Sequence, residues 1–252
     1  MTKATLIIQA RMGSTRMPGK VLKTLFQGES MLYWLLKRVE KAKSVNKYIV
    51  ATTNLEEDEV ITNECKRLNV LCYQGSDWDV LSRFYSASLL QPSDYYIRVC
   101  ADSPLVNAEI VDFAVNQCSS LNLDYFSNGN EPPYFIEDGF CVEVFKRECL
   151  FEAFIKAKWL SEREHVTPYI KKSNFYSKMW MKFRTSYQYK LSVDTIEDFN
   201  LVEKIFSLLD DPYLSGIDEV NALMSSMQLG DFNNIIYNEG YKKSLLDDRY
   251  LG

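Results

Sequence analysis

The sequence predicts an α/β fold: an open, mostly parallel sheet with helices on both faces, and a smaller β-containing lobe in the second half of the chain. Short apolar, β-rich segments alternate with helical patterns through the first 122 residues. Repeated strand–helix units require right-handed crossovers, which build parallel sheets covered by helices. From about residue 123 the alternation becomes irregular, so the smaller lobe is expected there.

In the first half, strands are expected at 5–10, 48–53, 70–73 and 95–101. Helices are expected after Ser30, which can cap the first of them, and at 57–68, 79–90 and 108–119. In the second half, strands are expected at 124–127, 140–145, 178–183 and 189–193. An amphipathic helix follows at 196–209, with Asp194 or Thr195 as its N-cap, and helices and a tail occupy 211–252.

Composition and charge exclude several classes of protein. The 252 residues are 46% hydrophobic, as in an ordinary folded chain, and the net charge of −5 argues against general attraction to nucleic acid or anionic membranes. No apolar run approaches the roughly 20 residues of a membrane helix, and the N-terminal apolar stretch is too short for a signal peptide. The six cysteines form no CxxC pair, which favours reduced thiols. We therefore expect a soluble, cytoplasmic protein.

A basic loop after the first strand carries the clearest chemical signal. Residues 7–22 read IIQARMGSTRMPGKVL, so a buried strand leads into a loop with Arg11, Arg16 and Lys20. Gly13 permits close backbone approach, and exposed amides and hydroxyls in such a turn bind anions. Three cations within ten residues suit a triphosphate. The loop matches neither the P-loop pattern nor the GxGxxG pattern of dinucleotide sites.

Two aspartates are expected at strand ends. Asp102 follows the strand YYIRVCA, and Asp194 follows YKLSV and precedes a helix. Carboxylates at two strand ends can meet across a pocket and hold Mg²⁺, which prefers oxygen ligands. Alternatively, Asp194 is only a helix N-cap and Asp102 belongs to a turn.

Three further polar residues have both a functional and a structural interpretation. Arg83 can contact a ligand or form a surface ion pair. Arg98 lies in an otherwise apolar strand, where an unpaired arginine is costly, so it either faces a pocket or belongs to a buried ion pair. His165 is the only histidine, so every Ser-His-Asp or Cys-His scheme would depend on it; the alternative is a structural histidine.

Residues 7–22 resemble the N-terminal signature of the cytidylyltransferase family that includes CMP-sialate and CMP-KDO synthetases. They most closely resemble its branch of spore-coat polysaccharide proteins of the SpsF type. The likeness extends through at least residue 210 and takes in, in family order, IVATT, GSDWDVLSRF, IRVCADSPLV, DYFSN, EDGFCVEVF, SEREHVTPYI and LSVDTIEDF. The resemblance implies a Rossmann-like nucleotidyltransferase fold of the GT-A-like type.

The resemblance also implies a function. A Mg²⁺-dependent enzyme would transfer CMP from CTP to a small acidic acceptor, such as a sugar acid, in surface polysaccharide synthesis, and would form a homodimer. The implied single domain comprises a nucleotide-binding half (1–122), an acceptor and dimerisation lobe (123–195) and C-terminal helices (196–252). Lys20, Arg11 and Asp102 would be catalytic, and Asp102 and Asp194 would bind the metal. The implied nucleotide contacts are Ala10, Arg11, Gly13, Ser14, Thr15, Arg16, Lys20, Arg83 and Arg98, and the implied acceptor contacts are Glu143, Arg163, His165 and Thr167.

One departure from the family pattern concerns the acceptor. SpsF-type sequences usually carry an aspartate where this chain has Cys141, which suggests a changed acceptor or weakened activity. Other readings stay open: another nucleoside triphosphate, a phosphorylated or non-sugar acceptor, a non-catalytic nucleotide-binding protein, or a glycosyltransferase that uses a finished nucleotide sugar.

Overall fold

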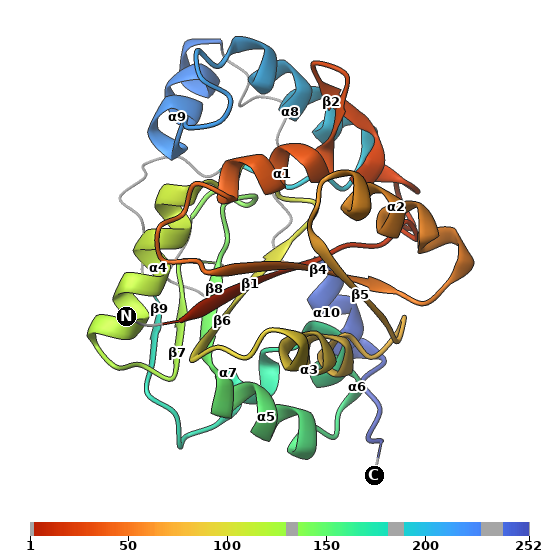
Figure 1. The fold of residues 1–252 in the computed structure, drawn as a ribbon, viewed down its shortest axis with the longest axis vertical. Helices are drawn as coiled ribbons and strands as arrows, with labels where there is room; N and C mark the ends of the chain where they lie inside the picture. The colour runs from red at the N-terminus through yellow and green to blue at the C-terminus, as the bar shows by residue number, and fades with distance from the viewer. Residues whose placement is uncertain (1–2, 130–135, 181–188, 228–238, 252) are drawn as a thin grey trace.

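A seven-stranded sheet forms the centre of the molecule (Figure 1), whose computed structural model describes residues 3–129, 136–180, 189–227 and 239–251. The strand order is β5-β4-β1-β6-β8-β7-β9. β8 runs antiparallel to both neighbours, and the remaining pairs are parallel. The predicted α/β class with a mostly parallel sheet is confirmed. The strands are β1 (Ala4–Gln9), β4 (Lys47–Thr53), β5 (Leu71–Gly75), β6 (Tyr95–Cys100), β7 (Tyr125–Ser127), β8 (Glu143–Lys146) and β9 (Lys178–Trp180).

Helices cover both faces of this sheet, as the alternating pattern predicts (Figure 1). Leu6 and Ile8 of β1 pack into one apolar cluster and Ile7 into a second on the opposite face, because successive strand residues point to opposite sides. Burial on both faces explains why the strand is a continuous apolar run. The first cluster includes α1 (Met31–Val39), α2 (Glu59–Arg67), α4 (Ala108–Ser120), α8 (Ile196–Leu208) and α9 (Ile217–Ser226); the second includes α3 (Val80–Leu90), α5 (Arg147–Lys156) and α7 (Pro168–Lys172).

Several shorter elements complete the described fold. A two-stranded hairpin, β2 (Thr24–Phe26) and β3 (Glu29–Ser30), was not expected from the sequence. Ser30 caps α1 as predicted, since its side chain accepts a hydrogen bond from the Tyr33 amide. The remaining elements are the 3₁₀ helices η1 (Lys20–Leu22) and η2 (Glu56–Asp58) and the helices α6 (Leu160–His165) and α10 (Glu239–Leu246).

Two predicted strands of the second half are wrong in part or whole. The strand expected at 189–193 is absent from the described structure, where one isolated bridge joins Asp138 to Lys190. Residues 189 and 191 exchange backbone hydrogen bonds with Asp138, but the amide of Val193 donates to the carbonyl of Asp102 instead, so no ladder forms. The strand expected at 140–145 begins only at Glu143, because the side chain of Asn128 bonds the backbone of 140 and 142 in place of a strand. Residues 181–183 of another predicted strand lie outside the described residues.

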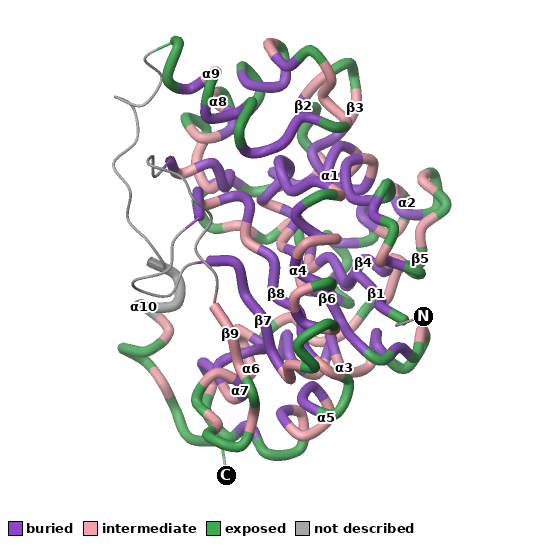
Figure 2. The backbone as a smooth tube through the Cα atoms, turned by 90° about the vertical axis from the view of Figure 1, so that its left-hand side faces the viewer, coloured by how far each residue is buried: buried purple, intermediate pink, exposed green. Residues whose placement is uncertain are grey.

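The strands of the second half extend the main sheet rather than form a sheet of their own, since β8, β7 and β9 follow β6 in order. Figure 2 shows buried backbone concentrated in the central strands and the inner sides of the surrounding helices. Among the described helices, none combines the length and apolar character needed to cross a membrane.

A buried arginine ties α1 to the chain that precedes α9. Arg38 is fully buried, and its guanidinium donates hydrogen bonds to the carbonyls of Leu105, Pro212 and Ser215 at 2.8, 2.5 and 2.6 Å. Burial lowers the pKa of Arg38 to about 10, so the group remains charged at neutral pH.

Candidate functional site

The candidate site lies where β1 and β6 end side by side. Gln9 and Cys100 are register partners in this parallel pair, and the amide of Ala101 donates to the carbonyl of Gln9 at 2.9 Å. The loop after β1 and the aspartate after β6 therefore meet at the same sheet edge. β1 has β4 on one side and β6 on the other, so this edge is a topological switch point, where open α/β sheets bind ligands.

Backbone contacts hold the basic loop in a compact turn. The carbonyl of Met12 accepts hydrogen bonds from the amides of Ser14 and Gly19, both at 2.8 Å, and the amide of Met12 donates to the carboxylate of Asp58 at 2.6 Å. Gly19 has a φ of 75°, a left-handed conformation that favours glycine. Asp58 is fully buried and also accepts a hydrogen bond from Thr53. Its role in holding the loop was not predicted.

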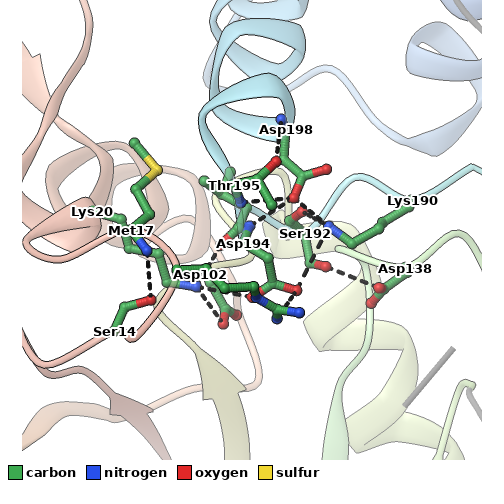
Figure 3. Close-up of polar contacts among 12 residues, drawn as sticks. Ser14, Met17, Lys20, Asp102, Asp138, Lys190, Ser192, Asp194, Thr195 and Asp198 are labelled. Atoms are coloured by element: carbon green, nitrogen blue, oxygen red, sulfur yellow. Dashed lines mark hydrogen bonds and ion pairs between the residues drawn. The ribbon is translucent and has the colours of Figure 1, made fainter. Parts of the chain in front are cut away.

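Lys20 links the two predicted metal-binding aspartates. Its ammonium nitrogen lies 3.3 Å from Asp102 Oδ2 and 3.2 Å from Asp194 Oδ1, and it donates to the carbonyl of Val193 at 2.5 Å (Figure 3). The Lys20 side chain is only 8% exposed. Burial alone would lower its pKa, but the two carboxylates raise it above the usual value. The group is therefore a fixed positive charge between two negative ones.

Asp194 does not cap the next helix, because Thr195 does, and the Asp194 carboxylate instead contacts Lys20. The hydroxyl of Thr195 accepts a hydrogen bond from the amide of Asp198 at the start of α8, which settles the choice of N-cap left open by the sequence. The second carboxylate oxygen of Asp194 lies 2.9 Å from Arg16. Burial alone would raise the pKa of Asp194, but Lys20, Lys190 and Arg16 lower it. The carboxylate is ionised at neutral pH.

A cavity of about 510 Å³ opens over these residues. Nine predicted site residues line it: Ala10, Arg11, Ser14, Thr15, Arg16, Lys20, Arg83, Asp102 and Asp194. Gly13 and Arg98 do not line it. The lining also contains four residues that were not predicted: Gln9, Val21, Cys100 and Ala101.

Arg83 and Arg98 have different placements. Arg83 is buried and donates to the carbonyl of Ser76 at 3.0 Å, and burial, together with the charge of Arg11, lowers its pKa to about 10. It lines the cavity, as a ligand contact requires. Arg98 instead forms the buried ion pair that was its alternative interpretation, at 2.5 Å from Glu143, its register partner across β6 and β8. Arg98 also donates to the side chain of Gln9 and so holds that cavity residue in place.

Glu143 is the centre of a buried polar cluster. Tyr125 and Thr167 donate hydrogen bonds to one carboxylate oxygen at 2.6 and 2.7 Å, and Lys171 lies 3.1 Å from the same oxygen. Burial alone would raise the pKa of Glu143, but Lys171 and Arg98 hold it well below the usual range. Glu143 and Thr167, both predicted acceptor contacts, line neither this cavity nor the one described next.

A second cavity of about 670 Å³ adjoins the first and shares Gln9, Arg11, Arg83 and Asp102 with it. Its other lining residues are Asp77, Trp78, Val80, Leu160, Glu164, His165, Arg249 and Leu251. His165 therefore lines a cavity, and its predicted contact with an acceptor stays a prediction. Its ring nitrogen lies 2.9 Å from the Ser244 hydroxyl, and burial, with the charge of Arg98, lowers its pKa to about 4. The imidazole is neutral at pH 7.

Arg163 and Cys141 lie outside the linings of both cavities. Arg163 forms a two-nitrogen ion pair with Asp79, the N-cap of α3, at 2.5–3.1 Å, and also donates to the carbonyl of Phe154. This placement favours a role in joining α6 to α3 over the predicted acceptor contact. Burial raises the pKa of Cys141 well above its usual value, so the thiol is protonated and unsuited to nucleophilic attack.

An open α/β sheet with a basic loop and carboxylates at its switch point is a site suited to nucleotide phosphates. A model of the cytidylyltransferase family matches residues 5–240, and the chain belongs to this family. It is 35% identical over 244 residues to an uncharacterized protein of Methanocaldococcus jannaschii, covering 94% of this chain and 97% of that protein. It is 30% identical over 218 residues to the spore coat polysaccharide biosynthesis protein SpsF of Bacillus subtilis, covering 82% and 87%.

Among solved structures, a cytidylyltransferase from Leptospira borgpetersenii shares the fold, with a TM-score of 0.86 at 24% identity over 94% of this chain and 100% of that one. These comparisons confirm the resemblance inferred from the sequence, including its SpsF-type branch. The roles of individual residues stay predictions.

Proposed function

We propose that the chain is a Mg²⁺-dependent cytidylyltransferase that transfers CMP from CTP to a small acidic acceptor, a sugar acid, in the synthesis of a surface polysaccharide. One observation carries the proposal: a basic loop, Asp102 and Asp194 converge on a single cavity at the switch point of the sheet. The membership in the cytidylyltransferase family supports CTP as the nucleotide.

The residues of the first cavity suit transfer of a nucleotidyl group. An acceptor oxygen would form a bond to the α-phosphorus of CTP, the bond from that phosphorus to the β-phosphate oxygen would break, and pyrophosphate and a proton would be released. Arg11, Arg16 and Lys20 would neutralise charge on the departing phosphates. The turn that begins at Met12 would hold these basic side chains in place. Catalysis by fixed charges of this kind needs no covalent intermediate.

The carboxylates of Asp102 and Asp194 fit a divalent cation. Both lie within 3.3 Å of one ammonium nitrogen, so their oxygens already converge on a positive charge. The described residues contain no cluster of three or more histidine, cysteine or carboxylate groups arranged for a metal, but Mg²⁺ is usually held by one or two carboxylates together with substrate phosphates. The chemistry that such an ion supplies is charge neutralisation on the triphosphate.

The proposal places the enzyme in the cytoplasm as a homodimer. All six cysteines are free thiols, which suits a reducing compartment. The dimer rests on the family resemblance, and its test is the molar mass in solution measured by light scattering.

Thermal unfolding with CTP, UTP, GTP or ATP, each with and without Mg²⁺, tests the proposal without knowledge of the acceptor. A ligand that binds only the folded state adds about 2.7 kcal/mol of stability at a hundredfold excess over its Kd. We expect the largest, Mg²⁺-dependent rise in melting temperature with CTP. Lys20→Met should lose it, whereas Lys23→Met, an exposed lysine three residues away, should keep it. Preference for another nucleotide would overturn the choice of CTP, and no response to any would favour a non-catalytic protein.

Pyrophosphate release from CTP with a panel of sugar acids then tests the reaction itself. Release that requires both CTP and an acid is the expected result. A glycosyltransferase would instead consume a nucleotide sugar and release a nucleoside phosphate, with no pyrophosphate.

A further inference from the structure

The C-terminal end of the chain forms one wall of the second cavity. Arg249 and Leu251 line it together with Leu160 and His165 of α6. The same cavity is also lined by Gln9, Arg11, Arg83 and Asp102, which it shares with the candidate nucleotide site. A ligand in the second cavity would therefore lie next to a nucleotide in the first.

Several contacts hold the segment 248–251 in place against α6. The carboxylate of Asp248 accepts hydrogen bonds from the amide and the hydroxyl of Ser161, both at 2.8 Å. The carbonyl of Arg249 accepts from the amide of Leu160 at 2.9 Å, and the amide of Leu251 donates to the carbonyl of Lys158 at 2.7 Å. These bonds direct the backbone of 249 along the cavity edge.

The cations of this cavity differ in whether they are already engaged. Arg11 forms an ion pair with Asp77 at 3.2 Å, and Arg83 is buried and donates to a backbone carbonyl. Arg249 is exposed, and within the described ranges its guanidinium has no hydrogen bond or ion pair. A planar guanidinium with unused donors is the group best suited to a carboxylate or a phosphate.

We propose that Arg249 binds the anionic group of the acceptor, a carboxylate or a phosphate, and that the segment 248–251 thereby determines acceptor specificity. The inference rests on the proposed function, since it assigns the second cavity to the acceptor of that reaction. The cavity volume of about 670 Å³ lies within the usual range of roughly 300–1,000 Å³ for small-molecule sites.

Calorimetric titration of the full chain tests this inference. The probes are 3-deoxy-manno-octulosonate, which carries a carboxylate, and glucose 1-phosphate, which carries a phosphate. Each is titrated with and without α,β-methylene CTP, an analogue that cannot release pyrophosphate. We expect at least one probe to bind the wild type, and Arg249→Gln to weaken that binding at least tenfold while the affinity for the analogue stays within twofold. Which probe binds identifies the anionic group.

Lys242→Gln is the matched control, because Lys242 is an exposed cation of α10 in the same C-terminal region and does not line the cavity. Its affinities for both probes should equal those of the wild type. Asp248→Asn, which weakens the attachment of the segment to Ser161, should weaken probe binding in the same direction as Arg249→Gln.

Two results would overturn the inference: no binding of either probe to the wild type, or equal binding by the wild type and Arg249→Gln. Failure of the CTP analogue to bind the wild type is a separate result that refutes the proposed function. The titrations without nucleotide would still decide the role of Arg249, because that residue does not line the first cavity.

Discussion

Replacing Lys20 by methionine is the most direct perturbation of the candidate site. Methionine keeps most of the side-chain volume but removes the ammonium that lies 3.2–3.3 Å from two carboxylates. Asp102 and Asp194 would then face the cavity without that cation, although Arg16 and Lys190 would still lie near Asp194. Both stability and turnover should fall, for separate reasons.

The size of the stability change follows from the exposure of the partners. Breaking a fully buried ion pair costs about 3–5 kcal/mol. The side chains of Asp102 and Asp194 are 32% and 25% exposed, so water would solvate them in part. We therefore expect a loss of about 2 kcal/mol in the free energy of unfolding, which for a chain of this size lowers the melting temperature by about 4–8 °C.

Turnover should fall about 100- to 1,000-fold, the usual effect of removing one group that stabilises developing charge. Calorimetric melting with and without Mg²⁺ provides a readout independent of activity. The ion should raise the melting temperature of Lys20→Met more than that of the wild type, because the two carboxylates have lost their internal cation. A variant with wild-type melting temperature and wild-type turnover would refute the reasoning.

Three further predictions concern groups outside the loop. Arg38→Met should lower the free energy of unfolding by about 3–5 kcal/mol in urea melts, since the carbonyls of Leu105, Pro212 and Ser215, the first and last of them buried, lose their donor; a change below 1 kcal/mol would contradict this. His165 has a pKa lowered to about 4 in the folded state, so the unfolded chain binds its proton first and stability is lost as pH falls from about 6.5 towards 4. His165→Gln should reduce that loss by on the order of 2 kcal/mol, and identical pH profiles would exclude the effect. Glu143→Gln should lower the melting temperature sharply because Arg98 and Lys171 lose their shared carboxylate; an unchanged melting temperature with a raised acceptor KM would instead support direct acceptor contact.

The sequence predicted the features that depend on neighbouring residues. Apolar runs separated by helical patterns identified β1, β4, β5 and β6 to within about two residues, because the buried strands of a parallel sheet are largely apolar. The hairpin of β2 and β3 was missed. The loop was recognisable since its cations, glycines and hydroxyls all lie within ten residues. Prediction of the strands was weaker after residue 123. There the side chain of Asn128 makes hydrogen bonds to the backbone that a neighbouring strand would otherwise make, so an apolar pattern did not mark the strand limits correctly.

Only the tertiary structure decided which distant groups meet. The register of β6 against β8 pairs Arg98 with Glu143 and so removes two predicted ligand contacts from the cavity linings. The return of the C-terminal segment to α6 brings Arg249 to the second cavity. Sequence determines local propensity and charge, whereas contacts between residues 45 to 174 positions apart, such as Arg98–Glu143 and Lys20–Asp194, depend on strand order and packing. The chemistry of the loop could therefore be inferred from its own residues, but the composition of the cavities could not.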